Sequence, residues 1–446
     1  MTALNLASPD LLRTLLRAGL PTAGGLSINA AHQGVDSYFV GQLGPEALAA
    51  VSLALPLTGL TAAIGVGLGI GTAAAAGRAL GAGRKQEAAR LASAAMALCL
   101  LLAALFAAAL WLARLPLLDV LGATGAVREP ALQYISILTL SAGLGMVQIL
   151  CDFTAIGSGH ARFSLFSLIF CFTLNMALDP LLIFTAGLGV RGAALATVLA
   201  QLATLALYGW YFTSSRTPLR LRPRLSGSAL ARLWPVLRIG LPEAASVLGA
   251  SLAFLLLYRL AGEHEGTAGQ AAMGIALRLW VLATLPVEGF CLGAQAVLAY
   301  AAGANNTARF ARAALTTAAI ATATASLFLL TGLLAAPQIS ALFTLDPAVQ
   351  SLAEPALAAF ALSLPATALR HAAQVSLQAT ARARDAALLG LAPLGWLFLP
   401  LLFTAAGFWG FAGLAPALSL AAFLTGLAAV LILLRLPHTP LKGLPA

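Results

Sequence analysis

The feature that most limits the fold of this chain is a series of apolar segments, most of them nearly free of charged residues. About 20 apolar residues in a helix are enough to cross the hydrocarbon core of a bilayer. Over the whole chain, 60% of residues are hydrophobic and 9% are charged, whereas soluble proteins carry about a quarter charged residues. The apolar segments are rich in Ala, Leu and Gly and lack alternating strand patterns, which favours packed helices over a barrel. We therefore predict an all-α polytopic membrane protein.

Hydropathy and turn signals predict twelve transmembrane helices. They cover residues 12–41, 46–76, 91–115, 128–155, 163–186, 191–213, 235–261, 268–302, 308–335, 348–380, 385–405 and 410–435. Most basic residues fall in alternate connections, including the arginine-rich stretch 216–224. By the positive-inside rule these connections and both termini are cytoplasmic. The net charge of +10 is then a topology signal, directed at anionic lipid and not at nucleic acid. No secretory leader is expected at the N-terminus.

Two halves of the chain resemble each other. AGLPTAGG at residue 18 matches IGLPEAAS at residue 239, and GTAAAAGRALGAGRKQEAAR at 71 matches GAQAVLAYAAGANNTARFAR at 293. Six helices per repeat give both halves the same orientation, related by a pseudo-twofold axis along the membrane normal. We predict a first lobe at 1–213, a cytoplasmic basic linker at 214–234 and a second lobe at 235–446, with a substrate cavity between the lobes.

Ionisable residues inside the predicted spans are few, and such residues usually mark ion or substrate paths. On the first helix Asn29, His32, Gln33 and Asp36 share one face because they are three or four residues apart. On the fifth helix Asn175 lies one turn before Asp179. If the two acids face each other they could bind and release a proton, or hold a sodium ion. The alternative is that the polar groups only join helices by hydrogen bonds.

The repeat provides an internal control for Asp179. The second half reads WLFLPLLF and keeps the proline and leucines, but has Leu399 where the first half has Asp179. A six-helix bundle therefore does not need this acid in order to fold. An uncharged residue would also insert at a cost roughly 3 kcal/mol lower. Both points favour a functional role for Asp179.

The remaining intramembrane charges are ambiguous. In the second half we expect either a buried ion network or a second binding site, formed by Glu243, Arg278, Glu288, Arg370 and His371. Asp152 lies close to the cytoplasmic end of the fourth helix, where a gating or capping role is expected. The four cysteines (Cys99, Cys151, Cys171, Cys291) are widely spaced inside apolar segments, which predicts neither a disulfide framework nor a metal site.

Four motifs resemble the multidrug and toxic compound extrusion family, within the superfamily that also contains lipid-linked oligosaccharide flippases. They are VDSYFVGQLGPEALAA, GVGLGIGTAAAAGRALGAG, AIGSGHAR and NMALDPLLIFTAGLGVRGAALAT. The resemblance implies twelve helices in two lobes and export of organic, often cationic or amphipathic compounds against H+ or Na+ flow. In the DNA-damage-inducible-like branch it implies a cation site, matched here by Asp36, Asn175, Asp179 and Thr197. Sodium-coupled relatives place an acid well inside helix 7 and another on helix 10, whereas here Glu243 comes directly after the helix 7 proline and helix 10 has Arg370 and His371 but no acid at the corresponding place.

We therefore predict a monomeric antiporter of a bacterial inner membrane that has no enzymatic activity and no cofactor. H+ is the favoured coupling ion and Na+ the alternative. Small organic molecules and membrane lipids are the expected partners, and His32, Gln33 and the charges of the second half are expected to serve the substrate or a gate. A lipid-linked precursor flippase is a second hypothesis, although such relatives usually have more helices and a more cationic cavity. A membrane-embedded transferase would need clustered acids near a membrane face, and none occurs.

Overall fold

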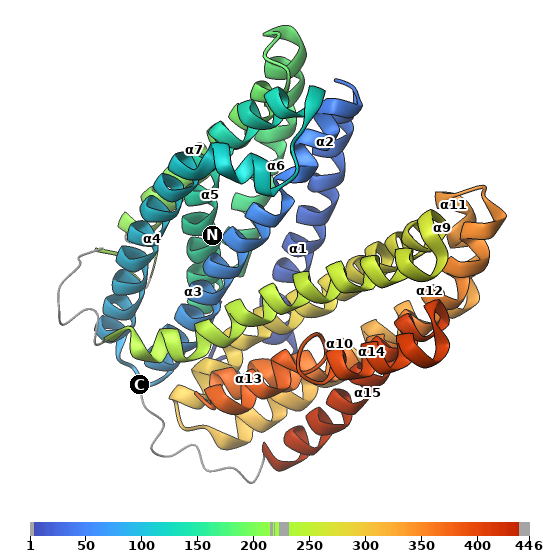
Figure 1. Cartoon of the computed structure of the whole chain (residues 1–446). Coiled ribbons are helices and arrows are strands. Elements are labelled where there is room, and N and C mark those ends of the chain that lie inside the picture. Colours follow the sequence, from blue (N-terminus) through green and yellow to red (C-terminus); the bar gives the residue numbers. More distant parts are fainter. Residues whose placement is uncertain (1–3, 215–216, 218, 223–231, 437–446) are drawn as a thin grey trace. The chain divides into compact units, whose positions relative to one another are not determined.

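The computed structural model describes residues 4–214, 217, 219–222 and 232–436. Across these residues the regular structure is helical, without a strand (Figure 1). The main helices are α1 (Leu11–Gly41), α2 (Pro45–Leu53), α3 (Leu55–Gly81), α4 (Lys85–Val120), α5 (Arg128–Gly157), α6 (Ala161–Pro180), α7 (Val190–Thr213), α9 (Trp234–Gly303), α10 (Thr307–Leu334), α11 (Ala336–Phe343), α12 (Pro347–Ala379), α13 (Ala383–Leu391), α14 (Phe398–Trp409) and α15 (Phe411–Arg435). Within the described ranges, nine helices are long and apolar enough to cross a membrane. The chain is thus an all-α polytopic membrane protein.

The predicted segments match these helices, and the differences have local causes. The segment 46–76 is interrupted at Ala54, just before Pro56, whose ring nitrogen cannot donate a helical hydrogen bond. The segment 385–405 is interrupted at 392–397, a turn that contains Pro393. In contrast, α9 runs through two predicted segments, with non-helical backbone only at Glu265 and Gly266. Most of the predicted linker 214–234 lies outside the described residues.

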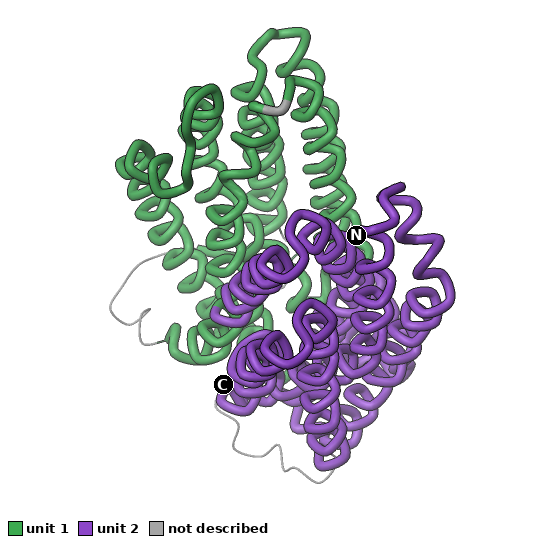
Figure 2. The backbone as a smooth tube through the Cα atoms, turned by 45° about the vertical axis from the view of Figure 1, so that its right-hand side comes forward, with its two compact units in different colours: residues 1–4, 24–244 green, residues 5–23, 245–446 purple. Residues whose placement is uncertain are grey.

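The chain forms two compact units, and each of them is built from two separate stretches of the sequence (Figure 2). Unit 1 consists of Met1–Leu4 and Gly24–Ala244, and unit 2 of Asn5–Ala23 and Ala245–Ala446. The first part of α1 therefore belongs to unit 2, and the first part of α9 belongs to unit 1. The two changes of unit, after residues 23 and 244, are 221 residues apart, which is the offset between AGLPTAGG and IGLPEAAS.

Glycines allow close helix crossings inside each unit. In unit 1, a β-carbon at Gly71 of α3 would lie 2.3 Å from the carbonyl oxygen of Val236, and one at Gly67 would lie 2.6 Å from that of Gly240. In unit 2, a β-carbon at Gly293 of α9 would lie 2.3 Å from the carbonyl oxygen of Ala18. Small residues permit such backbone approach between membrane helices. Each exchanged helix end is therefore packed directly on a glycine face.

Within unit 2, hydrogen bonds hold the residues that precede α1. The Arg309 guanidinium donates to the carbonyl oxygens of Ser8 and Leu6, at 2.7 Å each.

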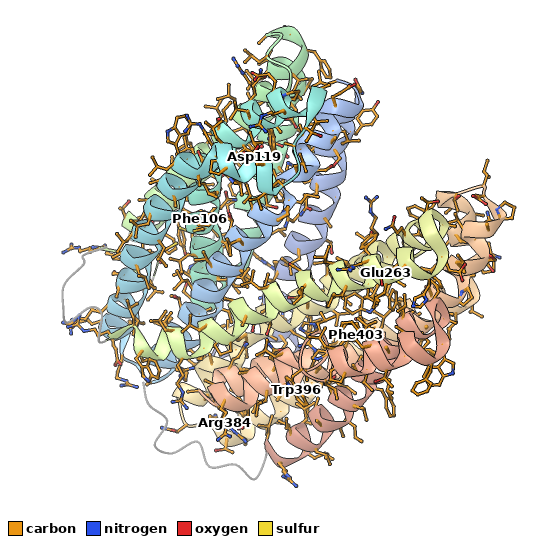
Figure 3. All side chains as sticks on the ribbon, in the orientation of Figure 1. Phe106, Asp119, Glu263, Arg384, Trp396 and Phe403 are labelled. Carbon is orange, nitrogen blue, oxygen red and sulfur yellow. The ribbon has the colours of Figure 1, made fainter. Side chains whose placement is uncertain are left out.

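Charged pairs elsewhere lie near helix ends and connections. They include Arg128 with Asp119 at 2.5 Å and Arg259 with Glu263 at 2.8 Å; Asp119 and Glu263 are labelled in Figure 3. These exposed pairs contribute little to stability.

Two apolar clusters fill unit 1. One gathers around Met146, Leu150 and Tyr208, and the other around Leu118, Ile135 and Ile183. The second cluster contains Leu57, Tyr134, Leu138 and Ala142, which also line a cavity. The packed core of this region thus forms part of a cavity wall.

Candidate cation site in the first unit

The cavity in unit 1 has a volume of about 500 Å³ and is bounded by α1, α2, α3, α5 and α7. All four polar residues predicted to share a face of α1 line it: Asn29, His32, Gln33 and Asp36. Thr197 and Gln201 contribute polar groups from α7, and Tyr134 from α5. The structure therefore brings the polar stripe of the first helix and the threonine of the sixth predicted helix to the same space.

Asn175 connects three helices beside this cavity. It is 2% exposed, and its Oδ1 lies 2.6 Å from Nε2 of His32 on α1. Its Nδ2 donates to Oγ1 of Thr197 on α7 at 3.5 Å, and that hydroxyl donates to the carbonyl oxygen of Ala193 at 3.1 Å. The imidazole of His32 is also stacked on Phe172, with ring centroids 4.3 Å apart. The amide of Asn175 is thereby oriented from both sides.

Asp179 lies one turn further along α6 and is fully buried. Among the described residues, neither of its carboxylate oxygens has a hydrogen-bond partner. Asp36 and Asp179 interact electrostatically, and both act on Tyr134. A buried carboxylate without hydrogen bonds is costly unless a proton or a cation compensates its charge. Asp179 is therefore suited to bind one of these, with Asp36 as its neighbour.

The side chains around Asp179 and Asn175 offer oxygen ligands that suit H+ or a hard cation. Carboxylate, amide and hydroxyl oxygens are the ligands that hard cations bind in proteins. Within the described residues, no group of three or more His, Cys, Asp or Glu side chains could hold a metal ion. A cation site here would therefore combine the two acids with the neutral oxygens of Asn175 and Thr197.

Asp152 belongs to a separate buried hydrogen-bond cluster. Its Oδ1 accepts from the hydroxyl of Tyr208 and, at 3.0 Å, from Oγ of Ser164. Oγ of Ser167 donates to the Tyr208 hydroxyl at 2.6 Å. The cluster joins α5, α6 and α7. Sequence reasoning missed Tyr208, because a tyrosine in an apolar segment gives no signal of a partner 56 positions away.

The charged residues predicted in the second half do not come together as one group. Glu243 belongs to unit 1, whereas the other four belong to unit 2, where Arg278 is exposed. Arg370 contacts Nε2 of His371 at 2.5 Å and donates to Gln374. Glu288 and Arg370 both act electrostatically on Cys291. The structure thus places Arg370, His371 and Glu288 in one neighbourhood of unit 2.

Unit 2 also contains polar groups that the sequence did not single out. Gln295 of α9 donates to Gln378 of α12 at 2.7 Å, and both side chains are buried. A cavity of about 230 Å³ is lined mainly by apolar residues of α9, α10, α11 and α12. Trp280 is in its wall, but its indole N–H is used by Ser363 at 2.8 Å. This apolar cavity has no acid in its wall and differs in this from the cavity of unit 1.

Comparisons with known proteins agree over most of the chain. The family model MatE matches residues 21–181 and 242–404. Multidrug export protein MepA of Staphylococcus aureus strain N315 is 26% identical over 433 residues, which are 94% of this chain and 93% of that protein. An FAD transporter of Shewanella oneidensis is 28% identical over 209 residues, 46% of each chain.

Solved structures of MATE transporters are also similar to this chain. A multidrug resistance MATE family transporter in an outward-facing conformation has a TM-score of 0.90 at 25% identity, covering 98% of this chain and 99% of that one. Structures described as MATE in the straight and in the bent conformation also reach a TM-score of 0.90 at 25% identity. Each covers 98% of this chain; the straight one is covered over 100% of its length and the bent one over 98%.

Proposed function

The chain belongs to the MatE family, and on that premise we propose that it exports organic, often cationic or amphipathic compounds by antiport with H+. Its relatives named as multidrug export proteins support the direction and the broad substrate class. H+ is preferred over Na+ as the coupling ion, because the tenth predicted helix has Arg370 and His371 but no acid where sodium-coupled relatives place one. The proposal also places the protein as a monomer in a bacterial inner membrane, with both termini in the cytoplasm.

One observation carries the proposal most directly. Asp179 is fully buried and its two carboxylate oxygens have no hydrogen-bond partner among the described residues. Leu399 takes the corresponding place in the second half, so the fold itself does not call for an acid. A proton bound at Asp179 from outside would remove the uncompensated charge, and its release to the cytoplasm would restore it. Asp36 would share this proton or pass it on.

Helix α1 is the element most suited to change its shape when Asp179 or Asp36 binds a proton. Pro21 cannot donate its backbone hydrogen bond, and Gly24 and Gly25 follow it. The chain changes from unit 2 to unit 1 between these residues, after Ala23. A β-carbon at Gly25 would lie 2.9 Å from Cδ1 of Leu168, so α1 is packed against α6 here. We propose that protonation bends α1 at this point, in line with the straight and bent conformations described for relatives.

Inverted vesicles with an imposed proton gradient test the proposal. Wild-type protein should accumulate an organic cation such as ethidium when the gradient is present and not after it is collapsed. Asp36→Asn and Asp179→Asn should lose gradient-driven uptake. Asp119→Asn is the matched control, because Asp119 is an acid of the same unit that pairs with Arg128 at an exposed helix end. Undiminished coupled transport by both cavity variants would refute the assignment.

A further inference from the structure

In the structure the amide of Asn175 is oriented with Oδ1 toward His32 and Nδ2 toward Thr197. The amide oxygen Oδ1 can only accept, so Nε2 of His32, 2.6 Å away, is the donor. A neutral imidazole with its hydrogen on Nε2 and a protonated imidazole both meet this requirement. His32 therefore donates to Asn175 whether or not it carries a charge.

This bond begins a continuous chain of donors. The Asn175 amide donates in turn to the Thr197 hydroxyl, which donates to the backbone carbonyl of Ala193. Stacking on Phe172 holds the plane of the His32 ring. The chain thus uses, as acceptors, both neutral oxygens that could complete a cation site with Asp36 and Asp179.

The hydrogen-bond chain from His32 to Ala193 affects the binding of a proton and the binding of a metal cation differently. A sodium ion needs several oxygen ligands at once, as hard cations do in proteins. Oδ1 of Asn175 has a second lone pair, but a sodium ion that used it would have to approach the N–H of His32, which points the positive end of its dipole at that oxygen. A proton needs no such shell, because one carboxylate oxygen of Asp179 is enough. Asp36 interacts electrostatically with His32, and Asp179 interacts with Asp36. Tyr134 lines the same cavity, and the polar groups that α3 and α7 contribute to its wall, such as Thr61, Thr197 and Gln201, are neutral.

We propose that His32 is the ion-selectivity residue of this cavity, which excludes Na+ by keeping Asn175 and Thr197 in a hydrogen-bond chain. The inference rests on the proposed binding of a coupling cation at Asp36 and Asp179. It assigns to His32 a positioning role, and predicts that removing its donor converts the proton site into one that also binds sodium.

Equilibrium binding of radioactive sodium to the purified full-length protein tests this inference without requiring transport. Wild type should bind no sodium saturably. His32→Phe keeps a ring against Phe172 but has no donor, and should bind sodium saturably, with a dissociation constant at least about tenfold below the lower limit that the wild-type measurement sets, the effect of one freed hydrogen bond. His32→Gln retains an amide donor and should still exclude sodium. Asp179→Asn added to His32→Phe should abolish the new binding.

Further variants make the outcome unambiguous. His264→Phe changes an exposed histidine of unit 2 and should bind no sodium. His32→Leu is a second donor-free variant if His32→Phe does not give monodisperse protein. Saturable sodium binding by wild type, or its absence from both donor-free variants, would overturn the inference. Because vesicle transport is measured separately, proton-coupled efflux without the sodium gain would leave the proposed function intact and reject only this role of His32.

Discussion

The crossing of α3 with the start of α9 makes a quantitative prediction about stability. A methyl group at Gly71 would lie 2.3 Å from the Val236 carbonyl oxygen and 3.1 Å from its carbonyl carbon. Both atoms belong to the backbone, so no side chain can turn away to make room. Gly71→Ala therefore has to separate the two helices or distort one of them.

The expected loss of stability in Gly71→Ala is measured against Gly209→Ala, a matched control variant. Gly209 lies inside α7 of the same unit, and a β-carbon there would meet nothing within 4 Å. Both substitutions gain the same helix propensity, about 1 kcal/mol. The difference between them is then the overpacking cost, about 1–3 kcal/mol. For a unit of this size that corresponds to a Tm difference of about 2–12 °C.

Heating the purified variants in detergent and measuring the remaining monodisperse fraction by size-exclusion chromatography gives this difference. Gly209→Ala should retain or exceed the wild-type Tm, and Gly71→Ala should fall below Gly209→Ala by the stated range. Equal Tm values for the two variants would show that the crossing is looser than the structure has it. The first part of α9 would then not be held on α3 by close glycine contacts.

Three further predictions concern polar groups of unit 1. Asp179→Leu, which copies Leu399, should be as stable as wild type or up to about 1–3 kcal/mol more stable, because an uncompensated buried carboxylate is removed. Gradient-driven uptake should be lost, and a lower Tm than wild type would contradict the prediction. Tyr208→Phe should lower stability by about 1–3 kcal/mol, because Asp152 and Ser167 each lose one of their two hydrogen bonds. Tyr38→Phe, at an exposed tyrosine, should have no effect on Tm. Burial lowers the pKa of His160, in the turn between α5 and α6, below its ordinary value of 6.5. The neutral imidazole therefore contributes stability above pH 6.5, and this contribution is lost as the pH falls through the lowered pKa of the folded state. The fall in Tm on acidification should be smaller in His160→Gln than in wild type.

Helix positions could be predicted from the sequence because lipid imposes a simple length and hydropathy rule. The rule fails where the structure depends on local backbone chemistry. Pro56 and Pro393 interrupt segments that hydropathy reads as continuous, and α11, of 8 residues, is too short for the rule to detect.

The candidate site shows a similar division. Spacing predicted that His32 and Asp36 share a face of α1, because helical periodicity is local. It did not predict that His32 contacts Asn175, 143 positions away, since that pairing depends on how α1 and α6 pack. Tyr134 was also missed, because one tyrosine among apolar neighbours looks like core in the sequence.

The exchange of helix ends has a consequence for synthesis. When the ribosome has produced the first six predicted helices, the faces of Gly67 and Gly71 still lack residues 234–244, which cover them in the finished unit. A fragment cut at the linker would keep this bare glycine face, and the complementary fragment would lack residues 5–23 against Gly289 and Gly293. Neither half of the gene product is therefore a self-sufficient folding piece, and the two fragments should become stable only when they are produced in the same membrane.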